Sequence, residues 1–214
     1  MSTRNSTVQN MGRAQRRRGL PIGTRSLLYG AHQVVIHPIF VGIAWVRLYG
    51  FTWDPRVWLA IVIHDWGYWG LPNMDGPEGD THVEWAARVM GRLFGPEWRD
   101  FCLYHSRFYA RRDAKPFSPL CVADKLATAL EPAWLYLPRV ILTGEIKEFM
   151  SLANGNNGSK YQGEPNSPYV TAQLSKGTII GWFRGMTGYL REWVETHKDG
   201  RDDMWTPAAR VSES

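Results

Sequence analysis

The sequence predicts an all-helical protein that folds as one bundle. From Pro21 to about Leu130, apolar residues recur at helical spacing, and only residues that begin or end helices interrupt them. Five such segments follow one another without the alternation of apolar and polar residues that marks a strand. A chain of 214 residues, 44% of them hydrophobic, is long enough for one ordinary core. We therefore expect a single folded domain.

The first two helices of this core have clear boundaries. One runs from Pro38 to Gly50 and carries more apolar residues than a single stripe requires, which indicates a buried helix. The next begins at Asp54 and Pro55, because aspartate accepts hydrogen bonds from the first turn and proline has no N–H to leave unsatisfied. It is expected to end at His64 and Asp65.

Three more helices are expected in the core. A loop over 67–79, rich in Gly, Pro, Asp and Asn, precedes Thr81 and Glu84, which have the spacing of a capping box. Ser118 followed by Pro119 begins the last of the three, again as a cap followed by proline. The expected helices span residues 81–95, 96–108 and 118–130.

The remainder of the chain gives weaker signals. Short helices are expected at 133–140 and 144–153, then a loop over 154–168 and a last amphipathic helix over 169–197. The predicted organisation is a disordered basic tail over residues 1–20, one domain over residues 21–197 and a second tail over residues 198–214. Within the domain, a core over 25–130 precedes the C-terminal helices over 133–197.

Charge and composition limit the classes of function. Seven arginines and no acidic residue lie between Met1 and Gly50, and such a basic run attracts phosphate groups. We expect a solvated tail there, with nucleic acid as an alternative partner. No stretch has the roughly 18 to 20 apolar residues that span a bilayer, and Cys102 and Cys121 are too few for a disulfide framework. A soluble cytoplasmic protein without a membrane partner is expected, with both cysteines in its core and a homo-oligomer open.

Histidine and aspartate carry the chemical signal. Five of the six histidines fall between residues 32 and 105, and histidine is both the commonest metal ligand and a general base near neutral pH. The apolar helical run 60–63 ends in His64 and Asp65, where an ionised aspartate is costly unless it is paired or coordinates a cation. Asp124 likewise interrupts a small apolar helical face. A metal site is one interpretation, and exposed polar pairs are the other.

The order of these residues resembles a known family. His37, then His64-Asp65, then Asp124 within Ala-Asp-Lys-Leu is similar to the His…His-Asp…Asp signature of the HD superfamily of all-helical, metal-dependent phosphohydrolases. Segment 37–44 resembles the first-histidine helix of that family, and segment 82–86 resembles its accessory histidine segment. The resemblance covers residues 25–130 and implies an HD-domain-like bundle. Its metal ligands would be His37, His64, Asp65 and Asp124.

One position departs from the pattern, because Pro38 disfavours helical geometry at the residue before it. His37 is therefore placed at the start of its helix, and His32 is kept as an alternative ligand. The resemblance further implies that His82 and His105 complete a second metal site with Asp65 as the bridge. The alternative roles of these two histidines are contact with substrate phosphate and protonation of the leaving group. We expect Asp65, His82 and His105 to be catalytic residues.

The implied chemistry is metal-assisted hydrolysis. Mixed imidazole and carboxylate ligands suit one or two ions of Mn, Fe, Co, Ni or Zn better than calcium, and such an ion activates water for attack on phosphorus. The expected substrate is a phosphate ester or anhydride, with a nucleotide favoured. Cationic residues expected to bind its phosphate are Arg107, Arg111, Arg112 and Lys125.

Two other functions compete with hydrolysis. Some HD-like proteins hold a mixed-valent di-iron site and use oxygen to cleave a small organic substrate, and the same histidines would serve there. The third hypothesis is a nucleic-acid-binding module that acts through the basic N-terminus. It predicts binding that weakens strongly with salt and is lost when residues 1–20 are deleted.

Overall fold

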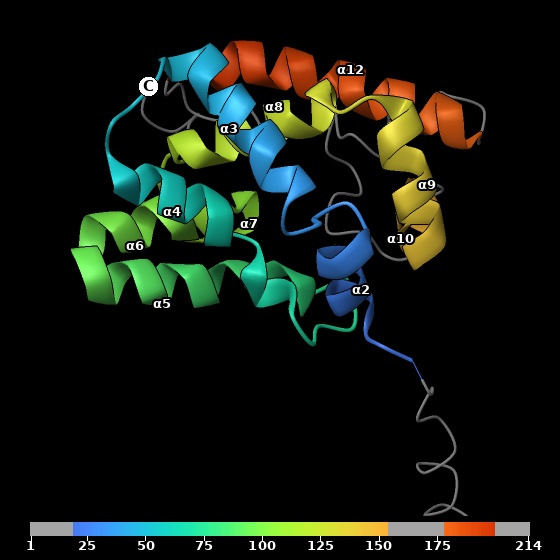
Figure 1. Cartoon of the computed structure of the whole chain (residues 1–214), viewed down its shortest axis with the longest axis horizontal. Helices are drawn as coiled ribbons and strands as arrows, with labels where there is room; N and C mark the ends of the chain where they lie inside the picture. Colours follow the sequence, from blue (N-terminus) through green and yellow to red (C-terminus); the bar gives the residue numbers. More distant parts are fainter. Residues whose placement is uncertain (1–18, 154–177, 200–214) are drawn as a thin grey trace, which may run out of the picture.

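The computed structural model of the chain describes residues 19–153 and 178–199. In these residues every regular element is helical, which confirms the predicted all-α class (Figure 1). Two short 3-10 turns are η1 (Trp66–Tyr68) and η2 (Gly79–His82). The α-helices are α2 (Ile22–Tyr29), α3 (Ile36–Tyr49), α4 (Pro55–Ile63), α5 (Val83–Phe94), α6 (Pro96–Leu103), α7 (Arg107–Arg112), α8 (Pro119–Leu130), α9 (Ala133–Thr143), α10 (Glu145–Ala153) and α12 (Ile179–His197).

Helix α8 lies at the centre of the packing. It contacts α3 and α12, while α5 packs along α6 and forms a separate layer (Figure 1). One face of α8, including Cys121 and Val122, belongs to an apolar cluster with α12, and another face, including Leu120 and Ala123, belongs to a cluster with α3, α4, α5 and α6. Cys102 and Cys121 are free and buried, as expected. The core is therefore two clusters joined by one helix.

Local sequence signals placed two helix starts correctly. The side chain of Asp54 accepts a hydrogen bond from the backbone N–H of Arg56, and the side chain of Ser118 accepts one from the N–H of Cys121. Helix α3 begins at Ile36, so His37 lies in its first turn, as expected. Pro38 has no backbone N–H, but the helix loses no hydrogen bond there, because N–H groups of the first turn have no partner within the helix.

The expected capping box is wrong. The Thr81 hydroxyl donates to the carbonyl of Glu78, and α5 begins only at Val83. The Glu84 carboxylate accepts from the Tyr109 hydroxyl instead of turning back to the helix start. A local 3-10 turn and a long-range contact therefore replace the expected cap.

The single helix expected over 96–108 is also wrong, because α6 ends at Leu103 and α7 begins at Arg107. The backbone N–H of Ser118 donates to the carbonyl of Tyr104 at 3.1 Å, which holds that carbonyl outside a continuous helix. His105 lies in the break.

Helix α3 is only half buried, although its apolar excess predicted a buried helix. Val41 and Ala44 are fully enclosed, but Ile39, Ile43 and Val46 are 40 to 56% exposed. The exposed side chains line a groove of about 790 Å³ together with α4. No described element covers this face.

Several predictions fall wholly or mainly outside the described residues. They are the basic tail at 1–20, the loop at 154–168, the first part of the helix over 169–197 and the C-terminal tail. The division into one domain with two tails stays a prediction.

The turns η1 and η2 meet at a glycine. A Cβ atom at Gly67 would overlap the backbone carbonyl of His82, so no side chain fits between the two turns. This close contact holds the segment after Asp65 against the segment that carries His82.

We predict that Gly67→Ala destabilises the fold by about 2 kcal/mol or more, because the added methyl has to push two backbone segments apart. Urea unfolding measures the change. Gly188→Ala is the matched control, since its Cβ would meet open space within α12, and alanine is expected to stabilise a helix interior by up to about 1 kcal/mol. Equal stability of the two variants would contradict the close contact.

Candidate metal centre

Four histidines and two aspartates from separate segments converge at one place. His37 comes from the start of α3, His64 and Asp65 follow α4, His82 ends η2, His105 lies between α6 and α7, and Asp124 lies in α8. All except His82 are buried. The structure thus brings together the four residues proposed as ligands of the first metal and the two histidines proposed for the second.

The first ligand group consists of His37, His64, Asp65 and Asp124. The Oδ2 atom of Asp65 lies 3.3 Å from His37 Nε2 and 3.1 Å from His64 Nε2. The Oδ1 atom of Asp124 lies 3.0 Å from His37 Nε2 and 3.9 Å from His64 Nε2. One ligand atom from each of the four residues lies within 4.8 Å of the others, which suits a shared ion.

The second group consists of Asp65, His82 and His105. The Oδ1 atom of Asp65 lies 3.6 Å from His82 Nε2 and 3.7 Å from His105 Nε2. Asp65 therefore directs one carboxylate oxygen to each group. His32, the alternative ligand, belongs to neither group.

Backbone carbonyls orient three of the imidazoles. The Nδ1 atom of His64 lies 2.8 Å from the carbonyl of Ile61, and His82 and His105 make the same contact with Gly79 at 2.6 Å and Cys102 at 2.5 Å. Because a carbonyl only accepts, each Nδ1 carries the proton and each neutral ring has a lone pair on Nε2. Such an outer hydrogen bond is typical of histidines that bind metals.

The unsatisfied atoms of the site test whether a cation fits. His37 Nε2, His64 Nε2 and Asp65 Oδ2 are buried and have no hydrogen bond of good geometry. The Nε2 atoms of His82 and His105 lie 3.3 Å apart, and in the neutral tautomers their lone pairs face each other. Each buried polar atom left unsatisfied costs about 1 to 3 kcal/mol. A cation in each group would satisfy these atoms, so the donor set fits a metal.

Electrostatics within the site point the same way. Burial alone lowers the pKa of His37, but the carboxylates of Asp124 and Asp65 outweigh burial and raise it to about 9. Burial opposes ionisation of Asp65 and Asp124. The imidazoles around Asp65, and Lys125 with His37 beside Asp124, nevertheless hold the pKa of each carboxyl well below its usual range. Without a metal, a proton on His37 supplies the positive charge that the two carboxylates attract.

Lys125 holds the other oxygen of Asp124. Its Nζ atom lies 2.5 Å from Asp124 Oδ2, leaving Oδ1 to face the imidazoles. Burial lowers the pKa of Lys125, but Asp124 outweighs burial and raises it. Lys125 is therefore a cation beside the candidate metal.

A small polar pocket of about 90 Å³ opens onto the site. Of the four cationic residues expected to bind phosphate, Arg107 and Lys125 line this pocket, whereas Arg111 and Arg112 do not. Arg112 instead pairs with Asp113 at 2.6 Å and lies over the ring of Tyr109 at 4.2 Å. Arg107 donates a hydrogen bond to the Tyr189 hydroxyl at 3.3 Å.

The loop over 67–79 contributes Tyr68 and Asp75 to the wall of the pocket, and the ring of Tyr68 stacks on His82 at 4.0 Å. Asp80, in η2, also lines the pocket, and sequence reasoning missed it. No local pattern singles out Asp80, because only the fold brings it to the site.

His32 also lines the pocket, and a chain of hydrogen bonds holds its ring in place. Its Nδ1 atom lies 3.0 Å from Ser26 Oγ, and the Ser26 hydroxyl donates to Glu145 Oε1 at 2.6 Å. Because the hydroxyl hydrogen goes to Glu145, Ser26 accepts from the Nδ1–H of His32. The ring is thus positioned by a fully buried glutamate at the start of α10, beyond the segment that carries the family resemblance.

Comparisons with known proteins add no assignment. No family model, curated protein or solved structure matches the chain. Among the described residues, no helix combines the length and the apolar character that crossing a bilayer requires.

We predict that the metal-free protein is most stable near pH 6.5. His37 has a folded pKa of about 9, above its ordinary 6.5, so its contribution is complete below pH 6.5 and is lost as the pH rises to about 9. Burial lowers the pKa of His32 to about 4, and burial followed by the nearby His105 lowers that of His82 to about 3. Protonation of these two rings therefore opposes folding as the pH falls below 6.5.

Urea unfolding in the presence of a chelator, from pH 5 to 9, measures this dependence. The expected loss above pH 6.5 is on the order of 3 kcal/mol. His37→Gln should remove that loss and keep the decline on the acid side. A wild-type stability that rises steadily through pH 9 would show that His37 is not held as a cation.

Proposed function

We propose that the chain is a metal-dependent phosphohydrolase of the HD type. The observation that carries the proposal is the position of Asp65, whose two oxygens face two groups of histidines. A carboxylate shared in this way suits a pair of ions. The ligand order in the sequence, His37, His64-Asp65 and Asp124, supports the same assignment.

Four imidazoles and two carboxylates favour a particular class of ion. Imidazole suits Zn, Fe, Ni and Co, whereas Mg and Ca prefer sites made of oxygen ligands. His37, His64, Asp65 and Asp124 would hold one ion, and Asp65, His82 and His105 would hold a second. When bound, such ions lower the pKa of a coordinated water and polarise a phosphoryl oxygen.

The chain's own residues would bind and orient the phosphoryl group. Arg107 and Lys125 place two positive charges in the wall of the pocket. The Tyr189 hydroxyl holds the Arg107 guanidinium, and Asp124 holds the Lys125 ammonium. Preorganised cations of this kind stabilise charge that develops on phosphoryl oxygens.

The volume of the pocket limits which part of the substrate can enter it. A water molecule takes about 30 Å³ of liquid volume, and ligand pockets for drug-sized molecules measure roughly 300 to 1,000 Å³. A cavity of about 90 Å³ therefore admits a phosphoryl group but not a whole nucleotide. We infer that the organic part of the substrate, whether nucleoside or smaller, stays outside this pocket.

The roles of His82 and His105 follow from their hydrogen bonds. In each ring the proton on Nδ1 faces a carbonyl, so in the neutral ring Nε2 presents its lone pair to the site. This arrangement favours metal ligands over proton donors to the leaving group. Asp65 would contribute to catalysis as the bridge.

The di-iron oxygenase remains the second candidate, because the nitrogen-rich ligand set also suits iron. Iron content together with oxygen consumption on an organic substrate would favour it. Phosphate release without oxygen uptake would favour hydrolysis. The nucleic-acid-binding hypothesis depends on the basic N-terminus, which lies outside the described residues.

We predict that His64→Ala combined with Asp65→Ala abolishes metal binding and turnover, because the double variant removes one imidazole and both bridging oxygens. Elemental analysis after incubation with Mn, Fe, Co, Ni or Zn measures the metal content. A phosphate-release screen across small phosphate esters and nucleotides measures turnover. Asp100→Asn, which changes a partly exposed aspartate in α6, is the control and should retain both.

Circular dichroism establishes whether the double variant remains folded. Full turnover in the folded double variant would eliminate the proposed centre. Metal binding by wild type without phosphate release, but with oxygen uptake, would transfer the assignment to the oxygenase.

Substrate binding gives a separate prediction. Arg107→Gln should raise KM for the best phosphate substrate about tenfold or more, since a charge-assisted hydrogen bond is worth about 1.5 to 3 kcal/mol. Arg112→Gln, on the same helix but paired at the surface, should leave KM unchanged. Equal effects of the two substitutions would mean that Arg107 does not contact substrate.

A further inference from the structure

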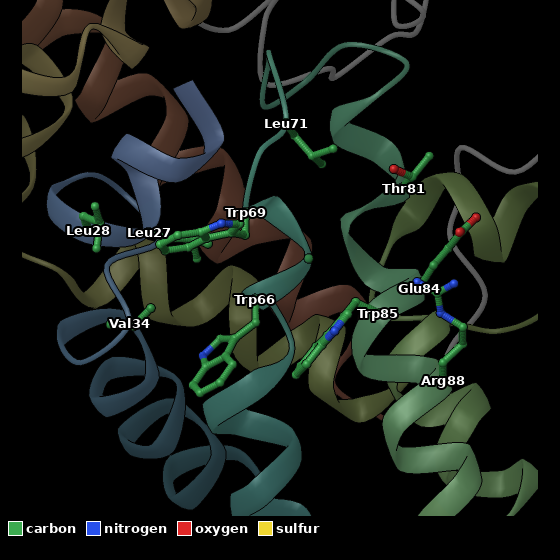
Figure 2. A pocket seen from close by; sticks show the side chains of 11 residues that line it. Leu27, Leu28, Val34, Trp66, Trp69, Leu71, Thr81, Glu84, Trp85 and Arg88 are labelled. Atoms are coloured by element: carbon green, nitrogen blue, oxygen red, sulfur yellow. The ribbon is translucent and has the colours of Figure 1, made fainter. Parts of the chain in front are cut away.

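A second cavity lies beside the candidate metal centre, between η1, α2 and α5. Its volume is about 690 Å³, within the range of small-molecule sites. Figure 2 shows the side chains that line it, among them Trp66 and Trp69 from η1 and its end, and Trp85 from α5. Leu27, Val34 and Leu71 extend the apolar wall. We refer to this cavity as the tryptophan cleft.

The cleft and the metal pocket share two backbone segments. Within 65–69, Asp65 and Tyr68 line the metal pocket, whereas the residues between and after them line the cleft. Within 80–85 the same division recurs, with Asp80 and His82 on the metal side. Residues of these segments on the cleft side are Trp66, Gly67, Trp69, Thr81, Glu84 and Trp85. The cleft is therefore a separate chamber behind a shared wall.

The walls of the cleft suit a flat aromatic ligand. Trp66, Trp69 and Trp85 are 42, 66 and 37% exposed, so a large aromatic surface meets solvent there. The rings of Trp66 and Trp85 are nearly parallel, with an interplanar angle of 23° and centroids 5.7 Å apart. Indole faces attract other aromatic rings beyond simple burial of area, and grouped exposed apolar surface of this kind marks ligand sites.

The polar groups at the cleft favour a ligand with an anionic group. Glu84 accepts a hydrogen bond from the Tyr109 hydroxyl, so its carboxylate already has a partner. Arg88, one helical turn further along α5, makes no hydrogen bond or ion pair in the part of the chain that the structure describes. Its guanidinium is available for an anion, and a guanidinium binds carboxylate, sulfonate or phosphate with paired donors.

We infer that the tryptophan cleft is a second ligand site, which takes a planar aromatic compound bearing one anionic group. The aromatic part lies against the indoles of Trp66 and Trp85, and the anion meets Arg88. This inference uses no residue of the metal centre and does not rest on the proposed function.

The test titrates the full-length protein with 8-anilinonaphthalene-1-sulfonate, an aromatic anion that becomes fluorescent in an apolar site. Arg88→Gln should weaken its binding about tenfold, since it removes a charge-assisted hydrogen bond. Trp85→Ala should weaken binding by a similar factor. The uncharged analogue N-phenyl-1-naphthylamine should bind with an affinity that Arg88→Gln does not change.

Two matched arginine variants serve as controls. Arg92→Gln changes an exposed arginine on the same helix that does not line the cleft, and Arg47→Gln changes the arginine of the groove between α3 and α4. Both should bind the probe as wild type does. Near-UV circular dichroism verifies that each variant keeps its tertiary packing.

Three results would overturn the inference. Loss of probe binding in Arg47→Gln but not in Arg88→Gln would place the probe in the groove along α3. Equal binding by wild type, Arg88→Gln and Trp85→Ala would place it elsewhere. A dimer in light scattering that Trp85→Ala converts to monomer would make the cleft an interface between copies.

Discussion

The burial of two ionised carboxylates inside a helical bundle is the constraint on which the rest of the site depends. Removing such a charge from water costs several kcal/mol, and the cost is offset only when opposite charge and hydrogen bonds surround the group. Within the chain, Asp65 and Asp124 meet this condition through His37 and Lys125, which come from different helices. The compensation therefore ties the start of α3, the end of α4 and the middle of α8 to one point.

Histidine is placed at this point by a repeated local device. The last carbonyls of a helix lack partners within the helix, and a histidine just past or at the end can donate to the carbonyl three residues earlier. His64, His82 and His105 all do so. The same hydrogen bond that satisfies a carbonyl at the helix end turns the Nε2 lone pair inward, so helix termination and ligand orientation have a single cause. The break between α6 and α7 places His105 at the site in this way.

What the sequence could predict depended on the range of the interactions. The helix starts at Asp54 and Ser118 were predictable, since each cap uses only residues within one turn. The candidate ligand set came from the order of His37, His64-Asp65 and Asp124, which resembles a family signature, and the structure brings these residues together. The expected capping box failed in part because Glu84 contacts the distant Tyr109, and the position of His32 depends on Ser26 and a glutamate more than a hundred residues away. Local patterns carry no information about such contacts.

The shared wall between the metal pocket and the tryptophan cleft explains why its residues are so closely constrained. Within 65–69, Asp65 and Tyr68 line the metal pocket and the other three residues line the cleft, so a shift that enlarges one chamber displaces the residues of the other. Gly67 permits the thinnest possible wall, because any side chain there would collide with the backbone of His82. Tyr68 then stacks on the His82 ring, and its neighbours Trp66 and Trp69 meet solvent on the far side. The residues Asp65 and His82 and the exposed indoles of the cleft are thus positioned by the same two backbone segments.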